Sequence, residues 1–143
     1  MARARISLWR RLPMIGRVAV GLELFVAIGA LVGGSLFMLG PDGHLMGMPV
    51  SLLSRSPFSS FLIPGLLLFS AIGIGPLAAA IVTYRRPTIA PLAAALVGLI
   101  LMGWVTIEMV MLAGPSSLLW ALYLVLGTGL TALGLSAAKA PPR

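Results

Sequence analysis

The sequence predicts an all-α fold, a transmembrane four-helix bundle that runs up-down-up-down and carries a short helix on its outer surface. Hydrophobic residues make up 59% of the 143 residues and charged residues only 9%, whereas soluble domains carry about 25% charged residues. Four apolar runs are each long enough to cross a bilayer, which takes about 20 helical residues. The links between the later runs are short, which makes neighbouring spans antiparallel.

The N-terminal segment, residues 1–13, alternates arginines with apolar residues. We expect it to lie in the headgroup region, with Trp9 at the interface and its arginines near anionic lipid. A cleaved signal peptide is the alternative, because an arginine-rich start precedes an apolar run. We favour a retained first helix, since the apolar run of residues 18–39 is long enough to span and has no convincing cleavage site.

A single membrane domain, residues 14–138, is expected to hold the spans, and residues 139–143 form a cytoplasmic tail. The later spans are predicted over residues 61–83, 90–112 and 118–138. Pro76 lies inside the second span, where proline removes a backbone donor and clashes with the preceding turn. We expect a kink there, first as a packing feature and second as a gating hinge.

The outer loop between the first two spans, residues 40–60, contains a turn signal and then an amphipathic stretch. Pro49 is followed by Leu52 and Leu53, and proline suits the first position of a helix. This pattern predicts a short surface helix over residues 49–55, with the two leucines turned toward the bundle or lipid.

The cations indicate the orientation of the chain. Nine of the ten lysines and arginines fall on one side of a four-span chain, and only Arg55 falls on the other. The positive-inside rule makes the first side cytoplasmic, together with both termini. We therefore expect a multi-pass protein of the bacterial cytoplasmic membrane that contacts anionic lipid. Nucleic acid is not an expected partner, because the basic cluster runs straight into a span and has no nucleic-acid-binding signature.

Small residues recur at four-residue spacing in a chain with 17 glycines. Membrane helices associate through close packing, because lipid offers no hydrophobic drive for association. The spacing predicts tight helix crossings, either within one chain or between copies in a homo-oligomer. The positions are Gly29 with Gly33, Ala30 with Gly34, Ala71 with Gly75, and Thr128 with Ala132 and Ser136.

Glu23 lies inside the first span, on a stripe of small residues spaced three and four apart. That spacing describes one face of an α-helix. A carboxylate at membrane depth is costly, so it should face protein or water. We interpret Glu23 first as a protonated or hydrogen-bonded link between helices, and second as a proton relay or ligand contact. The stripe comprises Gly16, Ala19, Ala27, Ala30 and Gly34.

The other candidate polar residues lie toward the outer side. Glu108 is expected near the outer end of the third span, about 20 Å in depth from Glu23, so the two cannot form a catalytic pair. Its expected partners are Arg55 or His44, or interfacial water. Asp42, His44 and Glu108 are too few for a metal site of established geometry, so no metal and no cofactor are expected.

The residue types also limit the chemistry. The chain has no cysteine, which excludes disulfides, thiolate metal sites and dithiol redox chemistry within it. No nucleophile, phosphate-loop or dinucleotide signature is present. We do not expect an enzyme.

The outer loop and third span carry a resemblance. The loop reads G-M-P-V-S-L-L and then S-P-F-S-S-F-L-I-P-G, and the third span contains G-W-V-T-I-E. These motifs resemble a widespread, mostly uncharacterised group of small bacterial four-helix integral membrane proteins. The likeness covers roughly residues 14–135 and implies the same architecture without naming an activity. Ser60 stands where the group usually carries an aspartate.

Three functions fit these observations. The first is a non-enzymatic protein that acts through helix association, as an accessory subunit or a homo-oligomer. The second is a small transporter or channel subunit with Glu23 in its pathway. The third is a subunit of a membrane redox complex, similar in size to the DoxX-like proteins, with the chemistry supplied by a partner.

Overall fold

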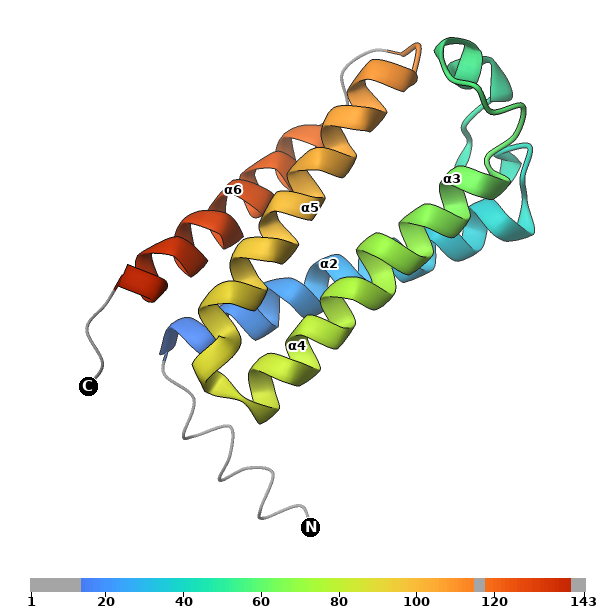
Figure 1. The fold of residues 1–143 in the computed structure, drawn as a ribbon. Coiled ribbons are helices and arrows are strands. Elements are labelled where there is room, and N and C mark those ends of the chain that lie inside the picture. Colours follow the sequence, from blue (N-terminus) through green and yellow to red (C-terminus); the bar gives the residue numbers. More distant parts are fainter. Residues whose placement is uncertain (1–13, 115–117, 140–143) are drawn as a thin grey trace.

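The computed structural model describes residues 14–114 and 118–139, so the basic segment 1–13 and most of the predicted tail lie outside the described residues. It confirms the all-α four-helix bundle (Figure 1). The first span is α2, Met14–Leu39, and the second is a continuous helix over Leu62–Arg85. The third is α5, Ala90–Met111, which follows the short turn η4, Pro87–Ile89, and the fourth is α6, Leu118–Lys139.

All four helices are long and apolar enough to cross a membrane, and the chain has the architecture of a small multi-pass membrane protein. The described starts and ends of α2 and α6 agree with the predicted spans to within a few residues. The start of α2, the η4 turn and the end of α6 lie at one end of the bundle, which we call the inner end (Figure 1). The loop after α2 lies at the opposite, outer end.

The second span adapts to Pro76 without breaking. It begins as α3, Leu62–Leu67, widens into the π-helix η3, Leu68–Ile74, and continues as α4, Gly75–Arg85. The N–H of Gly75 donates to the carbonyl of Ser70, five residues back. Because a proline has no N–H to give the preceding turn, widening that turn accommodates its ring. The predicted kink takes the form of this π-helical segment.

The outer loop contains the predicted surface helix. It forms two short 3₁₀ helices, η1 at His44–Met46 and η2 at Val50–Arg55, and Pro49 caps the second. Leu53 is buried and Leu52 is half-buried. Gly43 turns the chain before η1 with a φ of 80°, a conformation that side-chain-bearing residues rarely adopt. The helix predicted over 49–55 is confirmed, as a 3₁₀ rather than an α-helix.

The four spans form two tightly packed hairpins, α2 with α3–α4 and α5 with α6 (Figure 1). A Cβ atom on Gly34 would lie 2.7 Å from the carbonyl oxygen of Gly65, and one on Gly127 would lie 3.0 Å from the carbonyl oxygen of Gly98. Only glycine allows two helix backbones to approach so closely. Each hairpin is therefore held by a glycine pair.

The contact between the two hairpins changes along the bundle. Toward the inner end, the core cluster is built from the small residues Ala19 and Ala94 with Val97 and Leu130. Toward the outer end, larger side chains pack around the second cluster, among them Leu68, Trp104, Tyr123 and Leu126. Small residues let helices approach and large ones hold them apart. The hairpins therefore diverge toward the outer end (Figure 1).

Not every predicted small-residue pair packs inside the chain. Gly34 does, but Ala71 and Gly75 are exposed on the outside of the second span, and so are Thr128, Ala132 and Ser136 on α6. A Cβ atom on Gly75 would meet nothing closer than 4.0 Å. These positions do not pack within the chain, and the other predicted alternative, contact between copies, stays a prediction for them.

Two glycines of α5 test the role of close approach. We expect Gly98→Val to lower the free energy of unfolding by about 1–3 kcal/mol, because the side chain collides with the α6 backbone. Gly103→Val is the matched control, since a Cβ there has nothing within 4 Å. Thermal unfolding of the two variants in one detergent measures the difference. Equal losses would mean that helix propensity, and not packing, governs both positions.

Candidate functional site

A partly open cavity of about 620 Å³ lies between the hairpins at the outer end of the bundle. One wall is formed by the outer half of α2 and the start of the second span, and the other by the ends of α5 and α6 that lie nearest the outer loop. Side chains of η1, η2 and the segment that follows close the outer side. The lining is apolar and rich in aromatic and methionine side chains, including Phe37, Met46, Met48, Phe58, Phe61, Leu68, Trp104, Met111, Trp120 and Tyr123.

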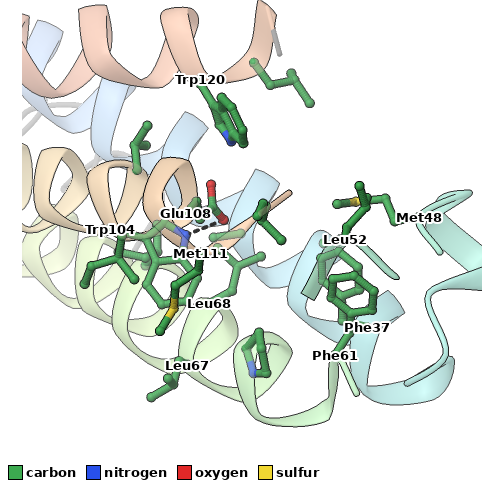
Figure 2. A pocket seen from close by; sticks show the side chains of 18 of the residues that line it. Phe37, Met48, Leu52, Phe61, Leu67, Leu68, Trp104, Glu108, Met111 and Trp120 are labelled. Atoms are coloured by element: carbon green, nitrogen blue, oxygen red, sulfur yellow. Dashed lines mark hydrogen bonds between the residues drawn. The ribbon is translucent and has the colours of Figure 1, made fainter. Parts of the chain in front are cut away.

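The outer loop is fixed over this cavity by two contacts. The rings of Phe37 and Phe61 stack with centroids 4.8 Å apart, which joins α2 to the end of the loop (Figure 2). The N–H of Ala113, just beyond α5, donates to the carbonyl of Leu52 in η2 over 2.7 Å. The loop therefore bridges both hairpins.

Glu108 is the only charged side chain among the described residues that line the cavity. The indole N–H of Trp104 donates to its carboxylate over 2.7 Å. The indole nitrogen of Trp120, from α6, is turned toward the same carboxylate (Figure 2), and the two side chains interact. Indole N–H groups only donate, so the carboxylate is held as an acceptor between two helices.

Tyr123 completes this polar group from α6. It is close enough to Glu108 for the two side chains to interact electrostatically, and it lines the same cavity. Its hydroxyl lies 2.9 Å from the place that a Cβ of Gly29 would occupy. Gly29 and Gly33 both line the cavity. Both belong to the predicted close-packing positions, and within the chain they make room for the cavity.

The two side chains predicted as partners of Glu108, Arg55 and His44, are wrong. Arg55 is exposed, and neither Arg55 nor His44 lines the cavity. The imidazole of His44 is instead bonded to the carboxylate of Asp42, two residues earlier in the exposed loop. Trp104 lies four residues before Glu108, and residues at this spacing are neighbours on a helix. This partner could therefore have been predicted from the sequence. Trp120 comes from another helix, so its position beside Glu108 could not have been predicted.

Glu23 lies on the predicted face of α2, and every member of the predicted stripe is buried. The side chain is fully buried, and neither carboxylate oxygen has a hydrogen-bond partner among the described residues. The interpretation of Glu23 as a hydrogen-bonded link between helices therefore finds no support in the described contacts.

A second unpartnered polar atom lies at the same depth, the hydroxyl of the fully buried Thr83. A Cβ on Gly73 of the second span would contact Leu31 of α2, and the helices run antiparallel. Glu23 lies eight residues from this contact and Thr83 ten, both toward the inner end. At a rise of 1.5 Å per residue, the two residues lie within about 3 Å of each other along the helix axes. Thr83 carries no distinctive signal in the sequence, because threonine is common in membrane helices and usually bonds its own backbone.

The two glutamates do not share a site. Glu108 lines the outer cavity and Glu23 does not, as their predicted depths implied. Within the described residues, no three His, Asp or Glu side chains lie close enough together to hold a metal ion. The candidate functional site is therefore the outer cavity around Glu108, and the pair Glu23 and Thr83 is a separate feature nearer the inner end.

Comparisons with protein-family models, with curated proteins and with solved structures found no match. The resemblance to small bacterial four-helix membrane proteins thus stays a prediction, and the site is interpreted from its own geometry.

Glu23 has a measurable stability consequence. A buried polar group without a partner costs about 1–3 kcal/mol, and leucine has a similar volume. We expect Glu23→Leu to raise the free energy of unfolding by that amount, and Glu23→Gln to leave it near the wild-type value, because the amide is equally unpartnered. Denaturation in detergent measures both. A destabilised Glu23→Leu would indicate that the carboxyl is partnered in the folded protein.

Asp42 has a testable pH dependence. The hydrogen bond from His44 holds the pKa of Asp42 below its ordinary value of 3.8. Because the pKa of Asp42 is lower in the folded protein than in the unfolded chain, its carboxylate stabilises the loop turn at pH values above the unfolded-state pKa. This stabilisation is lost as the pH falls through the folded-state pKa. We expect NMR titration of this sole aspartate to give a midpoint below 3.8, and His44→Ala to raise that midpoint. An unchanged midpoint in His44→Ala would contradict the assignment.

Proposed function

We propose that this chain is a non-enzymatic membrane protein that binds an amphipathic, lipid-like molecule in its outer cavity. The cavity itself is the observation that carries the proposal. Its volume of about 620 Å³ falls within the range of roughly 300–1,000 Å³ that is typical of small-molecule sites. Its lining is mostly apolar with a few convergent polar groups, which is also typical of such sites.

The depth of the cavity supports a lipid-like occupant. Its walls belong to helices of membrane-spanning length, and Leu68 and Leu101 lie deep in it. Apolar cavities exclude water, and lipid is the apolar phase nearest to this one. The polar groups gather around Glu108, within a turn of the end of α5. A tail among the leucines and a headgroup near Glu108 would match both parts of the lining.

The polar groups support binding rather than catalysis. Besides Glu108, the lining offers two indoles, one phenol and the hydroxyl of Ser56, which donates to the carbonyl of Leu53. Nucleophilic catalysis needs a nucleophile in hydrogen-bond reach of a base, and no such pair is present among these described residues.

The orientation follows the charge distribution. Arg85 and Arg86 lie at the inner end, where both described termini also lie. We propose that this end faces the cytoplasm of a bacterial cell and contacts anionic lipid. The cavity then opens in the outer half of the membrane.

Association with other membrane proteins is the second candidate function. The exposed small residues on the second span and on α6 support it, because such residues permit close helix contact. Ala71, Gly75 and Ala132 are representative. An accessory subunit or a homo-oligomer would cover these faces, and ligand binding in the cavity is compatible with either.

A substitution that fills the cavity tests the proposal. Gly33 lines the cavity, and a Cβ there meets only the end of Leu68 at 3.5 Å. We expect Gly33→Leu to weaken binding of a monoacylglycerol by about tenfold or more, equivalent to about 1.4 kcal/mol. Gly103→Leu is the control, because it adds the same side chain to an open lipid-facing position. Native mass spectrometry of delipidated protein titrated with 1-monolaurin measures both.

The proposal fails if the wild-type chain does not bind the monoacylglycerol with a stoichiometry of one. It also fails if Gly33→Leu and Gly103→Leu bind equally well while both remain folded. Circular dichroism of the same samples establishes that the helices are intact.

A further inference from the structure

The polar end of the outer cavity combines one carboxylate with three aromatic side chains. Glu108, Trp104, Trp120 and Tyr123 all line the cavity. Trp104 comes from the same helix as Glu108, one turn away, whereas Trp120 and Tyr123 come from α6. In Figure 2 the carboxylate lies between the two indoles, with the apolar part of the cavity beyond it.

No cation of the described chain neutralises this carboxylate. The described residues of the lining include no lysine, arginine or histidine, and the ion pair formed at the outer loop joins Asp42 to His44. The indoles supply hydrogen bonds but no charge. An uncompensated carboxylate in an apolar cavity is costly, and the cost falls when a cation pairs with it.

The surrounding rings favour one class of cation. Aromatic faces attract ammonium groups through the ring quadrupole, and tryptophan does so most strongly. Organic ammonium ions also lose less hydration than a small metal ion would, and the described residues lack the ligands that a metal needs. A carboxylate beside two indoles and a phenol is therefore suited to an alkylated ammonium group.

We infer that the outer cavity selects amphipathic molecules whose headgroup carries an ammonium ion, with Glu108 as its counter-ion and Trp104, Trp120 and Tyr123 around it. The inference rests on the proposed function and narrows its ligand class. The same chemistry occurs in a simple long-chain ammonium ion and in the headgroup of a zwitterionic lipid. Only the zwitterionic lipid carries a phosphate beside its ammonium group, so a probe with that phosphate distinguishes the two sources.

The test uses probes with one twelve-carbon chain and different headgroups. The full-length protein in a neutral detergent is titrated with dodecyltrimethylammonium, 1-monolaurin and dodecyl sulfate, and bound ligand is measured by native mass spectrometry. We expect the wild-type chain to bind the ammonium at least tenfold more tightly than the neutral probe, and the sulfate most weakly. Dodecylphosphocholine as a fourth probe then decides between the two sources, since only a zwitterionic site accepts its phosphate.

Glu108→Gln is the decisive variant, because it removes the charge and keeps an oxygen for both indole donors. We expect it to reduce the preference for the ammonium over 1-monolaurin to less than twofold, mainly by weakening the binding of the ammonium. Trp120→Leu should reduce the preference by a smaller factor. Gly103→Leu, a change outside the lining, should leave it unaltered.

The outcomes separate the two proposals. Equal binding of the ammonium and the neutral probe by the wild-type chain overturns this inference and leaves the proposed function intact. A preference that survives in Glu108→Gln also overturns it. If none of the probes binds the wild-type chain, the proposed function fails and this inference fails with it.

Discussion

The unequal size of the side chains between the two hairpins is the constraint on which the rest of the structure depends. Lipid provides no hydrophobic force to press helices together, so their separation follows from the side chains at their contact. Alanines near the inner end allow the hairpins to meet. Tryptophan, tyrosine and leucine near the outer end hold them apart. The cavity and the placement of Glu108 in its outer part follow from that gradient, while the glycine pairs hold each hairpin together.

The same gradient separates two kinds of polar burial. Near the inner end, Glu23 and Thr83 are enclosed by close packing and have no hydrogen-bond partners among the described residues. Toward the outer end, Glu108 has room for two indole donors beside it. A polar group between closely packed helices can form hydrogen bonds only with groups of those helices, because there is no space for any other partner. The wider outer end brings partners from two helices, which is why the site chemistry is found there.

Much of the fold could be predicted from the sequence, because span length and small-residue spacing are local properties. The four spans, the surface helix and the buried face of Glu23 all followed from them. The cavity could not be predicted, since it depends on how two hairpins cross. The loop partners proposed for Glu108 were wrong for a related reason: Arg55 and His44 suit a carboxylate by charge, but both are exposed on the loop and neither lines the cavity. The sequence left open whether Ala71 and Gly75 pack within the chain or between copies, because a spacing of four residues does not reveal which side of a helix faces the bundle.

The π-helix in the second span affects which side chains reach α2. In a regular α-helix each step of four residues advances the side-chain direction by about 40°, so positions four apart gradually leave a common face. Gly65, Phe69 and Gly73 are four apart, and all three positions contact α2. The wider turn of η3 reduces that drift. A chain shortened by one residue in this segment would regain a regular helix and rotate everything after Pro76, carrying Ala80 and Thr83 away from the bundle interior. The number of residues between Leu67 and Gly75 is thus as much a part of the fold as their identity.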